Sequence, residues 1–142
     1  MRITTTLAAA AFAAVTLAAC SSADAVDSPP TADAERPGVV RVGAQDAVAL
    51  LEDRDDLTVI DVRTPAEFAD GHLDGAELVD IYEPAFRDQI DGLDRDGAYV
   101  LYCRTGSRSG QAAAFMRDLG FTEVYDAGGL AELAQAGATV VR

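Results

Sequence analysis

The residue types that activate a thiol occur together in one short segment, Cys103-Arg104-Thr105-Gly106-Ser107-Arg108. An apolar run, 98–102, leads into the cysteine, and a helical pattern follows it. The first turn of a helix offers unpaired N–H groups and the positive end of its dipole. Gly106 permits a tight turn in which successive N–H groups face inward. With two flanking guanidiniums, the segment predicts a Cys103 pKa lowered from about 8.5 into the neutral range or below. The alternative is a turn around an inert, buried cysteine.

Short apolar runs alternate with helical patterns along the chain. Strands are expected at residues 39–42, 57–62, 76–79, 98–102 and 123–125. Helices are expected at residues 44–53, 66–69, 107–119 and 130–135, with another opened by Pro84. This alternation predicts an α/β domain with a mainly parallel five-stranded sheet between two helical layers. Ligands of such sheets bind off the carboxyl ends of the strands, which is where Cys103 falls.

The composition excludes several classes of function. Hydrophobic residues make up 49% of the chain, which is enough for an ordinary core and argues against general disorder. The formal net charge is −13, and all 11 basic residues are arginine. The absence of lysine excludes Schiff-base chemistry. The acidity argues against nucleic-acid binding, which depends on basic patches. A single histidine, His72, rules out a metal site built on histidine ligands.

The first residues have the pattern of a targeting segment. Met1-Arg2 precedes an uncharged stretch rich in Ala and Thr, which ends in Leu17-Ala18-Ala19-Cys20. This ending resembles the lipobox of bacterial lipoproteins, in which cleavage leaves an acylated N-terminal cysteine. Residues 1–19 are therefore expected to be a lipoprotein signal peptide, so that the protein is exported and anchored by Cys20 to the periplasmic or extracellular face of a membrane. The alternatives are a plain signal peptide with a chance cysteine, or a transmembrane helix.

The two cysteines are predicted to have different uses. Residues 20–38 are expected to be the lipidated cysteine and a flexible tether, since this stretch is rich in Pro, Ser, Ala and acids. Residues 39–142 then form the folded domain. Acylation of Cys20 would leave Cys103 as a lone thiol in an oxidising compartment, where paired cysteines are usual. An unpaired thiol there suggests a functional use.

Three separated motifs resemble the rhodanese family. They are Asp61-Val62-Arg63-Thr64-Pro65-Ala66-Glu67-Phe68, then Gly71-His72-Leu73-Asp74-Gly75-Ala76, then the cysteine loop at 103–108. The Gly128-Gly129 pair also fits, and the resemblance covers essentially residues 39–141. One departure is Leu133, where family members often place an aromatic residue. The resemblance implies a rhodanese-like three-layer α/β/α fold.

The resemblance also implies a two-step sulfur transfer without cofactor or metal. The Cys103 thiolate would take the sulfane sulfur from a small anion such as thiosulfate, or from a persulfide or polysulfide. The resulting persulfide would pass its sulfur to a thiol or to cyanide, and a protein is a further candidate acceptor. Arg104 and Arg108 are expected to orient the donor, as is Arg63 in one interpretation. Asp61, Arg63 and Glu67 are otherwise expected to form a bracing ion-pair network, and His72 a structural hydrogen bond.

Two other functions remain open from the sequence. A phosphatase or arsenate reductase of related fold would also use Cys and Arg in one loop, but phosphatases of that type place five residues between them. Here four residues separate Cys103 from Arg108, and the loop holds no acidic residue. A non-catalytic rhodanese module, for sensing sulfur species or docking a partner, is the other alternative.

Overall fold

The structure, a computed structural model, describes residues 38–142. The expected signal peptide, the acylated Cys20 and the tether fall almost entirely outside these residues and stay predictions. Among residues 38–142, no helix is both long and apolar enough to cross a lipid bilayer.

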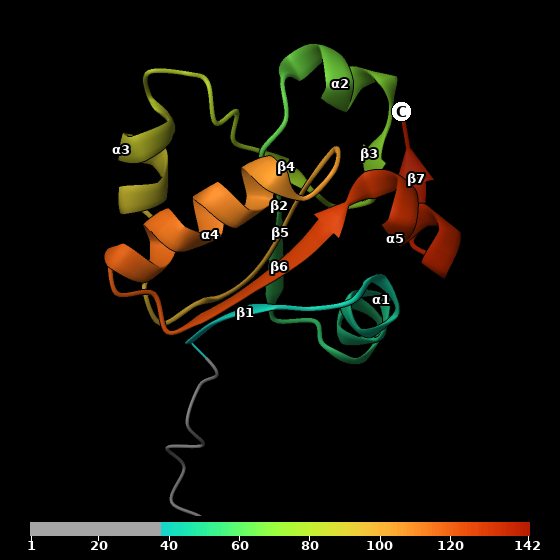
Figure 1. The fold of residues 1–142 in the computed structure, drawn as a ribbon, viewed down its shortest axis with the longest axis horizontal. Coiled ribbons are helices and arrows are strands. Elements are labelled where there is room, and N and C mark those ends of the chain that lie inside the picture. Colours follow the sequence, from blue (N-terminus) through green and yellow to red (C-terminus); the bar gives the residue numbers. More distant parts are fainter. Residues whose placement is uncertain (1–37) are drawn as a thin grey trace, which may run out of the picture. The chain divides into compact units, whose positions relative to one another are not determined.

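The core of the domain is a sheet of five parallel strands (Figure 1). In the order in which they pair, these strands are β1 (Gly38–Arg41), β6 (Glu123–Gly129), β5 (Ala98–Cys103), β2 (Leu57–Asp61) and β4 (Glu77–Leu78). All four pairings are parallel. Five parallel strands confirm the predicted fold class. The strand that ends in Cys103, β5, occupies the centre of the sheet.

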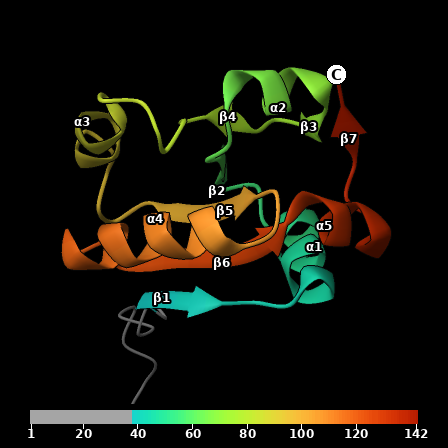
Figure 2. The same ribbon diagram turned by 45° about the horizontal axis from the view of Figure 1, so that its top comes forward.

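Helices cover both faces of this sheet. The helices of residues 38–142 are α1 (Ala44–Asp53), α2 (Pro65–Asp70), α3 (Phe86–Asp91), α4 (Ser107–Asp118) and α5 (Leu130–Ala136), of which all but α2 pack on a face of the sheet. One buried cluster joins α3 and α4 to one face, and a second joins α1 and α5 to the other. In both ribbon views α4 lies along the strands beside the loop that follows β5 (Figure 1, Figure 2).

Strand β5 explains how the cysteine is held. All six of its residues are buried, as expected for a central strand covered on both faces. Its side chains alternate: Tyr99, Leu101 and Cys103 enter the cluster under α4, whereas Val100 and Tyr102 enter the cluster under α1 and α5. Cys103 is therefore the last residue of a rigid element, with its side chain directed to the side where α4 begins.

A second, two-stranded sheet was not predicted. Strand β3 (His72–Leu73) pairs antiparallel with β7 (Val140–Val141), beside α2 at one end of the domain (Figure 2). Strands of two residues are too short to show a period of hydrophobicity, so no local pattern reveals them. Strand β6 also extends beyond the predicted 123–125, through a carboxylate and two glycines that intrinsic propensity disfavours in strands.

Candidate active site

The sulfur of Cys103 lies against the backbone that starts α4. The side chain is fully buried, and the Gly106 N–H donates to Sγ over 3.0 Å. Burial opposes ionisation of the thiol. The N–H groups of Ser109, Thr105 and Gly106 nevertheless face the sulfur, and the net result is a lowered pKa of Cys103. The loop thus stabilises negative charge on this one sulfur.

Glycines give this loop its shape. Gly106 has φ +89°, in the left-handed region that L side chains rarely adopt. A Cβ on Gly129, the last residue of β6, would come within 2.8 Å of the carbonyl oxygen of Arg104. The loop backbone therefore approaches the end of β6 more closely than any side chain at Gly129 allows.

Arg108 is held by a carboxylate of α2. Its two terminal nitrogens donate to the two carboxylate oxygens of Glu67, each over 2.7 Å, and both side chains are largely buried. Thr64 caps α2 and exchanges hydrogen bonds with the same Glu67. These bonds hold the Glu67 carboxylate in place independently of its contact with Arg108. The hydrogen bond from Arg108 is the main cause that lowers the pKa of Glu67 to about 2. The pair therefore ties α2 to the first turn of α4.

The Glu67–Arg108 pair predicts a specific acid sensitivity. Because the folded-state pKa of Glu67 is lowered from 4.5 to about 2, its stabilisation is present above pH 4.5 and is lost as pH falls toward 2. Glu67→Gln should lower the free energy of unfolding by about 2 kcal/mol at neutral pH. Urea unfolding should show this difference shrinking between pH 4.5 and 2.

The control for that experiment is Glu52→Gln, a change of the same kind at an exposed residue of α1. Its free energy of unfolding should equal that of the unchanged protein at every pH. A Glu67→Gln protein whose stability runs parallel to that of the unchanged protein across the whole range would contradict the role given to the pair.

The Arg63 guanidinium, which one interpretation expected to orient the donor, is hydrogen-bonded within the domain. Its Nε and one terminal nitrogen donate to the Asp61 carboxylate over 2.6–2.9 Å, and the same terminal nitrogen donates to the Gly71 carbonyl over 2.7 Å. The Arg63 side chain is 6% exposed, and its guanidinium lies 5.6 Å from the ring of Tyr102. The bracing expected of Asp61 and Arg63 is present. Glu67 joins Arg108 instead, so the expected three-residue network is divided in two.

His72 makes structural contacts. Its Nδ1 lies 2.9 Å from the carbonyl oxygen of Phe68, to which it donates, and its ring stacks on the Phe68 ring with centroids 3.6 Å apart. His72 also begins β3, which pairs with β7. These contacts join the end of α2 to the small sheet, in agreement with the expected hydrogen-bonding residue.

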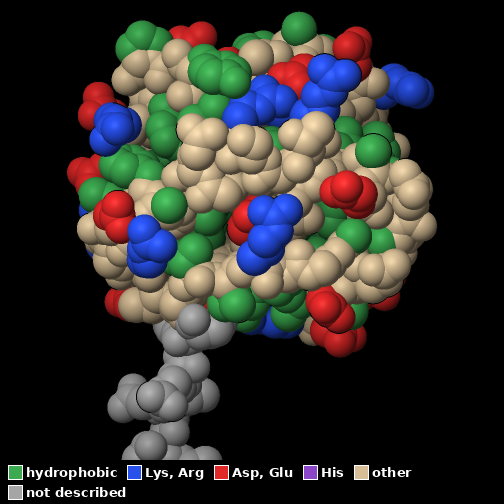
Figure 3. All heavy atoms as spheres, in the orientation of Figure 1, with side chains coloured by type: hydrophobic (Ala, Val, Ile, Leu, Met, Phe, Trp, Pro, Cys, Tyr) green, Lys and Arg blue, Asp and Glu red, His purple; other side chains and the backbone are tan. Residues whose placement is uncertain are grey.

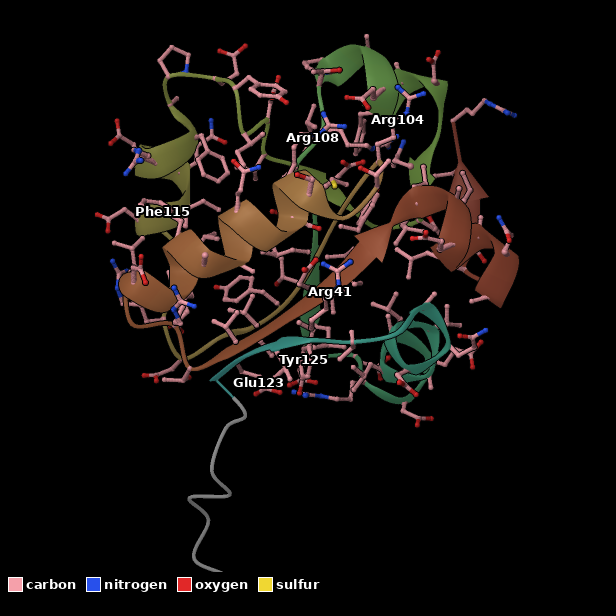
Figure 4. The ribbon with its side chains drawn as sticks, viewed as in Figure 1. Arg41, Arg104, Arg108, Phe115, Glu123 and Tyr125 are labelled. Carbon is pink, nitrogen blue, oxygen red and sulfur yellow. The ribbon has the colours of Figure 1, made fainter. Side chains whose placement is uncertain are left out.

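Three polar groups of the loop are open to solvent. Arg104, Thr105 and Ser107 are exposed, and the Arg104 side chain has no ion pair among the residues that the structure describes. Near them Tyr82 is 70% exposed, with the Arg108 guanidinium 5.8 Å from its ring centroid. Figure 3 shows basic side chains beside hydrophobic ones over the region where α2 meets the start of α4. Figure 4 shows Arg104 and Arg108 on this side of the domain.

Sequence reasoning missed three residues behind the loop. The buried Ser109 hydroxyl donates to Asp126 over 2.6 Å, and a terminal nitrogen of Arg41 donates to the same carboxylate over 2.9 Å. One signal was present in the sequence. Asp126 is a carboxylate within an otherwise apolar stretch next to the Gly128-Gly129 pair, and such a residue needs a partner when buried.

Three bacterial sulfurtransferases are similar to this chain in sequence. A sulfurtransferase from Allochromatium vinosum is 36% identical over 92 residues, which cover 64% of this chain and 84% of that protein. The thiosulfate sulfurtransferase PspE of Escherichia coli is 35% identical over 75 residues, which cover 53% of this chain and 72% of that protein. Thiosulfate sulfurtransferase GlpE of Pseudomonas putida is 36% identical over 86 residues, which cover 61% and 76%.

Solved structures share the fold. The rhodanese-like domain of the Anabaena protein Alr3790 matches with a TM-score of 0.63 and 26% identity, over 71% of this chain and 77% of that one. A rhodanese-related protein from Thermoplasma volcanium matches with a TM-score of 0.61 and 30% identity, over 71% and 96%. The sequence pattern of the rhodanese-like domain family matches residues 43–136, which make up more than half of the chain. With the cysteine loop held between β5 and α4 and this match over most of the domain, the chain belongs to the rhodanese-like domain family.

Proposed function

We propose that this protein is a sulfurtransferase that carries sulfane sulfur as a persulfide on Cys103. The observation that carries the proposal is the sulfur itself, buried at the start of α4 and 3.0 Å from the Gly106 nitrogen that donates to it. The names of the relatives support the same class of reaction, since each is called a sulfurtransferase or a thiosulfate sulfurtransferase.

The reaction is two displacements at sulfur. The Cys103 thiolate attacks the outer sulfur of thiosulfate, a new S–S bond forms, and the old one breaks as sulfite leaves with the electron pair. An acceptor, a thiolate or cyanide, then attacks the outer sulfur of the persulfide. The bond to Cys103 breaks, the thiolate returns, and the acceptor leaves with the added sulfur. No net oxidation occurs, because the sulfane sulfur moves from one nucleophile to another.

The loop and its arginines have separate roles in this scheme. The N–H groups that face Sγ also suit a terminal persulfide sulfur, which carries the negative charge after the first step. Arg104 is exposed and is the cation that meets an anionic donor. Arg108, whose charge is balanced by Glu67, aligns the loop on α2. This assignment changes the expectation that both arginines contact the donor.

The proposal is tested on the intact protein. After incubation with thiosulfate, the mass of the protein should increase by one sulfur atom located on the Cys103 peptide. Addition of cyanide should remove that sulfur and yield thiocyanate over repeated cycles. No gain in mass and no thiocyanate would favour a non-catalytic module. Hydrolysis of a small aryl phosphate would instead favour the phosphatase alternative.

A further inference from the structure

A buried carboxylate supports the loop from behind. Asp126, on β6, is 4% exposed. Its Oδ1 accepts from the Ser109 hydroxyl over 2.6 Å and from the Gly128 N–H over 3.2 Å. Ser109 is fully buried in the first turn of α4, and its backbone N–H is one of the groups that face the Cys103 sulfur. The carboxylate thus fixes the turn that supplies hydrogen bonds to the thiolate.

Arg41, at the end of β1, supplies the charge that this carboxylate needs. One terminal nitrogen donates to Asp126 Oδ2 over 2.9 Å. The other lies against the loop, since a Cβ added to Gly106 would be only 2.7 Å from it. Figure 4 shows the Arg41 side chain extending over β6 toward the start of α4. A single guanidinium therefore contacts the carboxylate and covers the loop glycine.

Without Arg41, Asp126 would be a buried, unpaired negative charge hydrogen-bonded to the turn that holds the thiolate. The other charged groups on the elements around the loop form pairs of their own or face solvent. They include Asp61 at the end of β2 with Arg63, Glu67 on α2, and Arg104 and Arg108 of the loop. Glu132 on α5 is exposed, although its carboxylate would lie 2.8 Å from a Cβ on Gly129. An uncompensated carboxylate disfavours ionisation of a nearby acid. Its burial without a partner is also strongly destabilising, so the groups that hydrogen-bond to it are expected to shift.

We propose that Arg41 is a positioning residue for the cysteine loop, because its guanidinium neutralises the buried Asp126 carboxylate that holds Ser109 and Gly128 beside Cys103. Arg41 acts through Asp126 and does not contact the donor. The inference deepens the proposed function, and it rests on that function only where turnover is measured. The ionisation of Cys103 can be measured whether or not the protein transfers sulfur.

The test compares Arg41→Met with Arg117→Met in the intact protein. Arg117 lies on α4, and its side chain is 63% exposed against 62% for Arg41, but within residues 38–142 its one ion pair is with the exposed Asp118. The readout is the pH dependence of iodoacetamide alkylation, followed on the Cys103 peptide so that Cys20 does not contribute. Arg41→Met should raise the pKa of Cys103 by about one unit or more. Arg117→Met should leave it unchanged.

Kinetics separate positioning from donor binding. With thiosulfate, at a pH below the Cys103 pKa that alkylation gives for the unchanged protein, Arg41→Met should lower kcat about tenfold and leave KM within about twofold, because only the thiolate fraction changes. A Cys103 pKa equal to that of the unchanged protein would overturn the proposal, as would an equal shift in Arg117→Met. If the unchanged protein transfers no sulfur, the proposed function fails while the alkylation comparison still decides the role of Arg41.

The double variant Arg41→Met/Asp126→Asn keeps the test decisive if Arg41→Met alone does not fold. The asparagine oxygen can still accept from Ser109 and Gly128, and no unpaired charge is left. The pKa of Cys103 in the double variant should therefore lie close to that of the unchanged protein. A raised pKa there would show that neutralisation of Asp126 is not what Arg41 contributes, and would overturn the proposal.

Discussion

Cys103→Ser should remove sulfur transfer while leaving the domain folded. The turnover of thiosulfate and cyanide is expected to fall on the order of 10⁴-fold or more, as when a covalent nucleophile is lost. A serine hydroxyl is not ionised near neutral pH and cannot form a persulfide. It is close in size to the thiol and can accept the same Gly106 N–H bond, so the fully buried site should stay packed. Thiocyanate formation and the intact mass after thiosulfate measure the effect.

The matched control is Cys20→Ser, which changes the other cysteine of the chain. It should transfer sulfur at the rate of the unchanged protein, and only Cys103→Ser should lose the added sulfur in the mass spectrum. Near-UV and far-UV circular dichroism should be unchanged in both. Loss of turnover in Cys20→Ser with full activity in Cys103→Ser would mean that the sulfur-carrying cysteine has been wrongly assigned.

The fold could be predicted where local pattern and burial agree. Residues 57–61 and 98–103 form largely apolar strands because both faces of the sheet are covered, and α1 begins and ends at the predicted residues. The short β3–β7 pair was missed because it joins two segments that lie far apart in the sequence. Strand β6 was predicted too short, since pairing with β5 and the hydrogen bonds from Ser109 and Arg41 to Asp126 stabilise a stretch that local propensity disfavours in strands.

The site was predictable in its centre and not in its supports. Cys103 and Gly106 follow from a strand, a turn and a helix that are adjacent in sequence. The partner of Arg108 does not, because Glu67 lies 41 positions away and its geometry depends on how α2 packs. The Arg41–Asp126 pair spans 85 positions. Charges near a loop can be listed from a sequence, but which of them neutralise each other is decided by the tertiary fold.

Gly106→Ala should lower turnover about 10²-fold and raise the pKa of Cys103. An alanine Cβ at φ +89° would lie 2.7 Å from a terminal nitrogen of Arg41 and 3.3 Å from the Gly128 Cα. The Arg41 side chain can move, at the expense of its bond to Asp126, but the Gly128 backbone cannot easily do so. We expect the loop to shift instead, which carries the Gly106 N–H away from Sγ. Thiosulfate turnover and the pH dependence of Cys103 alkylation measure both effects.

Gly120→Ala separates loop geometry from backbone strain. Gly120 follows α4, with φ +87° against +89° for Gly106, and an added Cβ there meets no atom within 4 Å. Both variants should lose about 1–2 kcal/mol of the free energy of unfolding from forcing an L residue into the left-handed region. Gly106→Ala should lose more, because its Cβ also meets Arg41 and the Gly128 backbone. Only Gly106→Ala should lose turnover. Equal turnover in the two variants would mean that the N–H groups of the loop do not control the reactivity of Cys103, because the strain is shared and the contact with the sulfur is not.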